Sequence, residues 1–216
     1  MSYNNTTYIY LLLTFLLCTG CADSYFSGSN NIVSTTRELP EFTRVVASID
    51  LDISITQNNT QLVEVIVNDN LQERILTNVS GNTLFISLID GSYRNETFQV
   101  NIQVPSLEKI QLNDNTRAEI DFSTNQLELE VNGSSEVNLQ GTSEVLYTNI
   151  NDDGRINALL FITSVLNTTS RDASEIEITC SNELNGSIDQ AARVSYRGMP
   201  VINARTSEDG QIININ

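Results

Sequence analysis

The side chains best suited to chemistry in this sequence are carboxylates in turn-like segments. Asp152-Asp153, Asp172 and Glu208-Asp209 occupy equivalent positions of an internal repeat. Carboxylate oxygens are ligands that Ca²⁺ accepts, so a ladder of these corners along one edge could bind Ca²⁺ weakly. The alternative, which we favour, is that they are solvated turn residues, because none follows the twelve-residue spacing of an EF-hand.

Other kinds of catalytic or ligand-binding chemistry find little support. The chain has no His, which excludes Ser-His-Asp and Cys-His catalysis and His-based metal sites. No glycine-rich phosphate loop opens a helix. The net charge of −16 argues against nucleic acid as a partner, since phosphates require Lys and Arg. We therefore predict no enzyme and no catalytic, cofactor-binding or metal-binding residue.

The element that must position the acidic corners is a repeat that runs from residue 110 to 216. Each unit opens on an apolar residue, and a second apolar anchor follows ten residues later. A less regular unit opens at Ile110. The five regular openers are Leu127, Leu146, Leu166, Leu184 and Ile202, and the second anchors are Val137, Ile156, Ile176, Val194 and Ile212.

This periodicity predicts stacked coils of β-strand. Within a unit, Leu127, Leu129 and Val131 alternate with glutamates, which is the period of a strand. Each unit is too short for two packed helices, and a self-similar period of this length indicates a solenoid. We predict an all-β, right-handed parallel β-helix (β-solenoid) with about 18–20 residues per coil. Val137, Ile156, Ile176 and Val194 are expected to lie one above another.

The preceding segment, residues 42–104, is β-rich but follows a different pattern. Alternating apolar residues predict four strands, separated by turn-like Asn, Asp and Gly. We expect longer strands or hairpins here that cap the N-terminal end of the stack, because a bare end leaves an unpaired edge. The four predicted strands are Val45–Ile55, Leu62–Val67, Leu84–Leu88 and Phe98–Val104.

The first residues have the layout of an export signal. Tyr8 to Leu17 is an apolar run too short to span a bilayer, and Cys18-Thr19-Gly20-Cys21 follows it. This ending resembles a bacterial lipobox. It predicts a signal peptide over 1–20, lipid attachment at Cys21, a flexible tether to residue 36 and a single domain over 37–216. An ordinary signal peptide cut nearby is the alternative. Cys180 is then the one cysteine left, and we expect it to be buried.

Asparagine and aromatic residues complete the candidate surface. Asn-Xaa-Ser/Thr triplets begin at Asn58, Asn78, Asn95, Asn132, Asn167 and Asn185. We interpret them as turn residues whose side chains can bond along the coil axis. Phe122, Tyr147, Phe161 and Tyr196 do not fall at one repeat position, which predicts no aromatic platform for sugar rings.

Several short segments resemble the head GIN domain family of auto-transporter adhesins, found in bacterial exported lipoproteins. They are Arg37-Glu38-Leu39-Pro40-Glu41-Phe42, Ile53-Ser54-Ile55-Thr56-Gln57, Asn68-Asp69-Asn70-Leu71 and Gly81-Asn82-Thr83-Leu84. The nearest counterpart of the signature tripeptide is Val201-Ile202-Asn203, with Val in place of Gly. The resemblance covers about residues 37–216 and implies a parallel β-helix with an adhesion role and no catalytic residues.

The sequence thus predicts a non-catalytic lipoprotein that serves adhesion or scaffolding. We expect it to be exported and lipid-anchored in the cell envelope, with the outer membrane of a Gram-negative bacterium as the expected site. Its expected partners are that membrane, through the anchor, and a protein or glycan surface ligand. The alternative is a Ca²⁺-assisted carbohydrate-binding or carbohydrate-active protein.

Overall fold

A computed structural model describes residues 25–216, and almost every described element is a β-strand. A short 3₁₀ helix, η1 (Asp69–Arg74), is the exception. The strands are β1 (Tyr25–Ser27), β2 (Ile32–Arg37), β3 (Arg44–Ser48), β4 (Asp52–Gln57), β5 (Leu62–Asn68), β6 (Ile75–Ser80), β7 (Thr83–Leu88), β8 (Ser92–Arg94), β9 (Phe98–Val104), β10 (Lys109–Asn113), β11 (Arg117–Val131), β12 (Glu136–Ile150), β13 (Arg155–Ser170), β14 (Glu175–Ile188), β15 (Arg193–Arg197), β16 (Val201–Thr206) and β17 (Gln211–Asn214).

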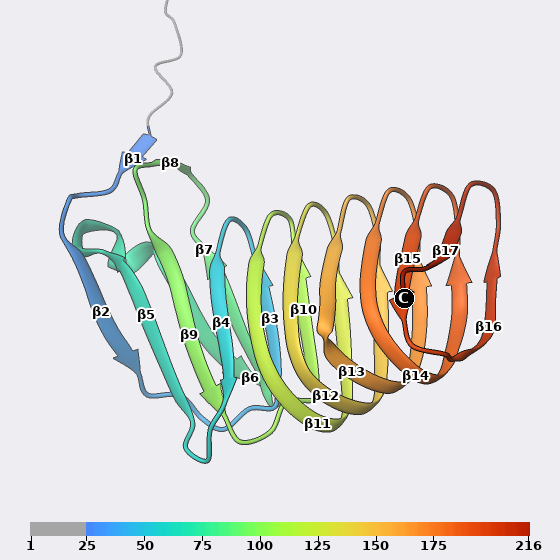
Figure 1. The fold of residues 1–216 in the computed structure, drawn as a ribbon. Helices are drawn as coiled ribbons and strands as arrows, with labels where there is room; N and C mark the ends of the chain where they lie inside the picture. Colours follow the sequence, from blue (N-terminus) through green and yellow to red (C-terminus); the bar gives the residue numbers. More distant parts are fainter. Residues whose placement is uncertain (1–24) are drawn as a thin grey trace, which may run out of the picture.

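The strands wind into a flattened solenoid of about 6 turns with two faces (Figure 1). The front face contains, in order, β2, β5, β9, β4, the first halves of β11 to β14, β15 and β17. The back face contains β6, β7, β3, β10, the second halves of β11 to β14, and β16. From β11 onward, front strands run down and back strands run up as the coils advance to the right, which makes the winding right-handed. The predicted fold class is confirmed.

The core consists of columns of like apolar residues between the two faces. Val137 pairs with Ile156, Ile156 with Ile176, and Ile176 with Val194, as predicted. All four are at most 1% exposed. The openers Leu127, Leu146, Leu166, Leu184 and Ile202 form a second column. Ile110 is the exception, because it pairs with Leu129 and so lies one inward-facing position further along its coil.

The corners between back and front strands turn through a residue with positive φ. The column of these residues is Asp114, Gly133, Asp152, Asp172, Gln190 and Glu208, with φ between 53° and 69°. Asp and Gly tolerate this left-handed conformation better than apolar residues do. The turn residues that separate the repeat units in the sequence are therefore the residues that close each coil.

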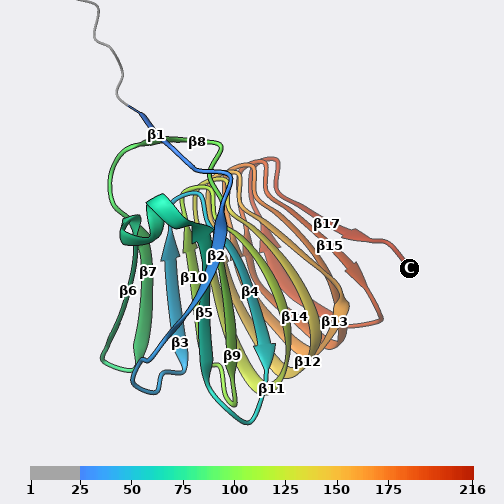
Figure 2. The same cartoon turned by 90° about the vertical axis from the view of Figure 1, so that its left-hand side faces the viewer.

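The N-terminal end is capped by antiparallel strands, as the sequence predicts. On the front face β5 pairs antiparallel with β9 and with β2; on the back face β6 pairs antiparallel with β7 (Figure 2). One strand prediction here is wrong. The segment Val45–Ile55 is divided into β3 and β4 by a corner at Ile49 and Asp50, with φ of 71° and 28°. It is a complete coil that pairs with β10 and β11.

The predicted tether over 21–36 is too long. β1 pairs with β8, and β2 pairs with β5, so residues 25 to 36 belong to the folded domain, which begins before the expected boundary at 37. Backbone pairing and side-chain bonds to η1 hold this segment, for instance from Ser29 Oγ to Asp69 Oδ1 at 2.6 Å. The predicted signal peptide and Cys21 lie outside the described residues. No helix within residues 25–216 is long and apolar enough to span a bilayer.

Cys180 is buried, as predicted. Its side chain is fully enclosed in the core, and its thiol donates to the carbonyl of Glu183 at 3.1 Å. Burial raises the pKa of the Cys180 thiol above its ordinary value. A buried thiol with a raised pKa is a packing residue and a poor nucleophile.

Candidate functional site

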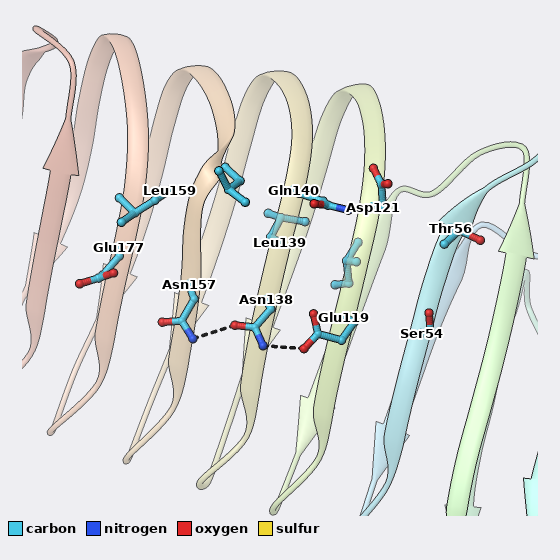
Figure 3. A pocket seen from close by; sticks show the side chains of 12 residues that line it. Ser54, Thr56, Glu119, Asp121, Asn138, Leu139, Gln140, Asn157, Leu159 and Glu177 are labelled. Atoms are coloured by element: carbon cyan, nitrogen blue, oxygen red, sulfur yellow. Dashed lines mark hydrogen bonds between the residues drawn. The ribbon is translucent and has the colours of Figure 1, made fainter.

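An open groove of about 390 Å³ crosses the front face over β4, β11, β12, β13 and β14 (Figure 3). Successive strands contribute outward-facing residues at the same height, because neighbouring coils are in parallel register. The groove combines carboxylates, amides, hydroxyls and leucines. Its lining includes Ser54, Thr56, Glu119, Asp121, Asn138, Gln140, Asn157, Leu159, Leu160 and Glu177.

A bulge in β13 gives the groove its apolar component. The register with β12 shifts between Asn138 and Gln140, and that with β14 shifts between Ala158 and Ile162. The extra residues place Phe161 in the core while Leu160 and Ile162 lie outside, 75% and 53% exposed. Exposed apolar side chains contribute little to the core, so this patch has no evident role in folding.

A chain of side-chain hydrogen bonds fixes the amides of the groove. Asn157 Nδ2 donates to Asn138 Oδ1 at 2.8 Å, and Asn138 Nδ2 donates to Glu119 Oε1 at 2.6 Å. Figure 3 shows the two bonds crossing three successive coils. Since each amide is oriented by its neighbour, the groove presents a preorganised polar row instead of freely rotating side chains.

The groove is lined by acidic side chains, and a row of paired acidic and basic side chains lies along one side of it. Glu119, Asp121 and Glu177 supply its negative charge. Next to them is a row in which acidic and basic residues alternate from coil to coil. It includes an ion pair of Arg117 with Glu136 at 3.6 Å and one of Arg155 with Glu175 at 3.3 Å. Exposed pairs of this kind add little stability, about 0–1 kcal/mol each. They favour the observed coil register over alternatives in which like charges meet.

A column of aromatic rings lies beneath the groove. Phe122 pairs with Gly141, and Gly141 pairs with Phe161, so a glycine separates two fully buried rings. The four aromatic residues of the repeat do not fall at one position, as predicted, although Phe122 and Phe161 share one. Because both rings face the core, they nevertheless form no platform on the surface.

The back face has a second open depression, of about 540 Å³, over β11 to β14. Tyr147 lies in it and is 41% exposed, beside Glu128, Glu130 and Asn167. Tyr147 pairs with Glu128 and Asn167 in the neighbouring coils, so it is an isolated ring. No bulge raises apolar residues here, and we regard the front groove as the better candidate site.

The acidic corners serve the backbone. Asp152 Oδ2 accepts from the Gly133 amide at 3.2 Å, and Asp172 Oδ2 accepts from the Asp152 amide at 3.4 Å. Each side chain thus satisfies a turn of the previous coil. Within residues 25–216 no group of three or more acidic, Cys or His residues is placed to hold a metal ion. The predicted ladder exists, but its geometry gives no support to a Ca²⁺ site.

Stacked asparagines bond along the axis, as predicted, at three of the six Asn-Xaa-Ser/Thr triplets, those of Asn132, Asn167 and Asn185. The interpretation as turn residues is wrong for Asn78, Asn167 and Asn185, which lie within β6, β13 and β14. Asn132 Nδ2 donates to Asn113 Oδ1 at 3.0 Å, and Asn151 Nδ2 donates to Asn132 Oδ1 at 2.9 Å. A second ladder joins Asn167, Asn185 and Asn203. These bonds connect coils outside the core.

Sequence reasoning did not identify the groove residues. Glu119, Asn138 and Asn157 lie on three different coils and carry no motif. The one available signal was unit length, because the coil that contains the bulge, from Ile150 to Ser170, is longer than the next coil, from Ser170 to Ile188.

These observations define a parallel β-solenoid with a polar, open groove and no assembled catalytic group among the described residues. The chain belongs to the family described as "Putative auto-transporter adhesin, head GIN domain", whose model matches residues 41–200. The match begins four residues later and ends sixteen residues earlier than the resemblance predicted from the sequence. Membership of an adhesin-type family suggests an exported or surface protein.

Solved structures of several bacterial proteins share the fold. A "putative adhesin" from Bacteroides fragilis has a TM-score of 0.70 at 19% identity, covering 88% of this chain and 100% of that one. A "putative lipid binding protein" from Parabacteroides distasonis gives 0.53 at 16%, and a "putative adhesin" from the same species gives 0.51 at 15%. Both comparisons cover 89% of this chain and 100% of the other. No curated protein sequence matches the chain. Neither the family nor these three structures are described as enzymes.

Proposed function

We propose that this protein is a non-catalytic adhesin of the cell envelope, anchored by lipid at Cys21, whose front groove binds a glycan chain. The observation that carries the proposal is the bulge of β13, which exposes Leu160 beside a fixed row of amides and carboxylates. Sugars present hydroxyl groups and apolar ring faces together. A site with a few oriented polar groups next to an apolar patch suits that chemistry.

The charge of the groove narrows the class of glycan. Glu119, Asp121 and Glu177 would repel sulfated or uronic-acid polymers, as would the net charge of −16. A neutral glycan, or one that carries amino groups, meets no such penalty. Its hydroxyls can donate to the carboxylates and to the Asn138 amide oxygen, and a sugar face can cover Leu160.

Anchoring at Cys21 would keep this surface in the envelope. The sequence places a short apolar run and small residues before Cys21, as in a lipobox. Several acyl chains on one residue hold a folded domain at a bilayer, where a single chain binds marginally. We expect the outer membrane to be the site of attachment, with the solenoid as the ectodomain.

The groove is tested with an array of neutral, amino-bearing and acidic glycans, followed by calorimetric titration of any that bind. Asn138→Ala removes bonds at the centre of the row, and Leu160→Ser removes the most exposed apolar side chain of the groove. A lost hydrogen bond of about 1 kcal/mol weakens binding about fivefold. We expect each variant to lose at least that factor without a change in glycan preference.

The matched control is Asn167→Ala, which removes an asparagine of the back-face ladder and leaves the front groove intact. Its affinity should equal that of the unmodified protein. The proposal fails if no neutral or amino-bearing glycan binds, or if Asn167→Ala weakens binding as much as Asn138→Ala. Turnover of the bound glycan would contradict the non-catalytic part.

A further inference from the structure

A small two-stranded ribbon projects from the N-terminal end of the solenoid. β1 and β8 pair in parallel there, separate from the main sheet (Figures 1 and 2). All three residues of β1 are at least partly exposed. The hydrogen bond from the Gly28 amide to the Arg94 carbonyl, at 2.9 Å, closes the ribbon at its C-terminal end.

Aromatic rings fasten this ribbon to the core. The ring centres of Phe26 and Tyr93 are 5.8 Å apart. Tyr93 makes an edge-on contact with buried Phe98, with 5.1 Å between the ring centres. Tyr93 also donates its hydroxyl to the carbonyl of Ile89. The ribbon is therefore docked on the domain, and its outward surface has a fixed orientation.

The partly exposed rings of the ribbon are each paired with an arginine. The Arg74 guanidinium lies 3.7 Å from the centre of the Phe26 ring, and that of Arg94 lies 3.9 Å from the centre of the Tyr25 ring. Tyr25 is 48% exposed, Phe26 36% and nearby Ile89 37%. Neither arginine takes part in an ion pair within residues 25–216. Consecutive residues of a strand point to opposite faces, so Phe26 lies on the face that contacts Tyr93, and Tyr25 and Arg94 stack on the other face.

The cluster of rings and arginines lies close in the chain to Cys21, the predicted site of lipid attachment. Four peptide steps separate Cys21 from Tyr25. A fully extended chain covers at most about 3.6 Å per residue, so Tyr25 lies within about 14 Å of the backbone of Cys21. If Cys21 carries acyl chains in a bilayer, this short linker keeps Tyr25 within or close to the layer of lipid headgroups.

We propose that the β1–β8 ribbon docks in the headgroup layer of the membrane that holds the anchor, through Tyr25, Phe26, Arg74 and Arg94. This inference depends on the lipid anchor of the proposed function. Aromatic rings favour the interface between water and hydrocarbon, and guanidinium groups bind lipid phosphates through several donors. Docking would convert a loose attachment into an oriented one.

The acidic neighbours decide which membranes the ribbon fits. Asp90 and Glu96 flank β8, so the cluster is not strongly cationic. The rings and the phosphate contacts therefore supply the binding, and a net negative membrane charge is not required. We expect docking on phosphatidylcholine vesicles as well as on vesicles with anionic lipid.

The test uses tryptophan as a probe, because the chain contains none. The full-length acylated protein carrying Tyr25→Trp is reconstituted in phosphatidylcholine vesicles with and without brominated lipid, which quenches tryptophan near the bilayer. Tyr147→Trp is the matched control, since Tyr147 is similarly exposed, at 41%, but lies on a distant coil. We expect a blue shift and strong quenching for Tyr25→Trp, and neither for Tyr147→Trp. Adding Arg94→Glu should reduce the quenching.

Mass spectrometry and vesicle flotation on the same samples separate the two proposals. A chain that is acylated and floats, but whose Tyr25→Trp emission is not quenched, overturns the docking and leaves the anchor standing. Equal quenching of both probes also overturns it, because the domain would then contact lipid without orientation. A chain that is not acylated overturns the anchor and the docking together.

Discussion

Replacing Gly141 with alanine should destabilise the protein far more than the same change at Gly81. Gly141 has a φ of 119°, and a Cβ there would lie 2.1 Å from the carbonyl oxygen of Phe122. The conformation costs a non-glycine residue about 1–3 kcal/mol. Displacing the neighbouring coil adds about 1–3 kcal/mol. We therefore expect a loss of about 2–6 kcal/mol, a large part of the roughly 5–15 kcal/mol that holds a domain folded.

Gly81 isolates the conformational part of this cost. Its φ is 56°, and a Cβ there meets no atom within 4 Å. Gly81→Ala should lose about 1–2 kcal/mol, from the left-handed backbone alone. Urea unfolding, followed by far-ultraviolet circular dichroism and by tyrosine emission, measures both variants. A repeat protein can unfold in parts, so agreement between the two signals is needed to show that unfolding is cooperative. If Gly141→Ala were no less stable than Gly81→Ala, the close approach of coils beneath the groove would be refuted.

Three further predictions use single residues. Ile156 lies in the core column and is 1% exposed, so Ile156→Ala should lower the free energy of unfolding in urea by about 2–5 kcal/mol. Ile162→Ala, on the bulge, should change it by about 0.5 kcal/mol or less. Equal losses would contradict the assignment of Ile156 to the core and of Ile162 to the surface. Cys180 should resist iodoacetamide at neutral pH in the folded protein and react in urea, with peptide mass spectrometry as the readout. Hydrogen bonds from Ser34 and Asn101 lower the pKa of Glu64. Their contribution to the stability of the folded protein is therefore complete above the ordinary glutamate pKa of about 4.3. It is lost as the pH falls through the lowered pKa of the folded state. Glu64→Gln should flatten this acid limb of the stability profile, and an unchanged limb would refute the assignment.

The columns of the core could be predicted because stacking makes them periodic. Each coil must place an apolar residue against the same position of the next coil, so Val137, Ile156 and Ile176 recur at nearly constant spacing. Corners were predictable where Asp or Gly takes the left-handed position. The corner at Ile49 was not, because an apolar residue there continues the alternation of β3 into β4 and imitates one long strand.

The predicted N-terminal boundary of the domain, at residue 37, was wrong for a different physical reason. The segment that contains β1 and β2 is small, polar and mostly exposed, so composition alone makes it look like a tether. Its order comes from backbone pairing with β8 and β5, which are both distant in the sequence. Pairing over such distances leaves no local signature, because the partner strand supplies the hydrogen bonds.

The candidate site was hidden for a related reason: it lies where the repeat is broken. A regular coil buries its apolar residues and exposes a polar row, and any two coils then look alike to a ligand. The coil of β13 has extra residues, and these place Leu160 in solvent while Phe161 keeps the core filled. The regular coils therefore account for stability, and the irregular one distinguishes a single place along the face. The same reasoning applies to the β1–β8 ribbon, which leaves the stack at its N-terminal end. If the front groove binds a glycan as proposed, restoring the regular length of the β13 coil should remove that binding while leaving the solenoid intact.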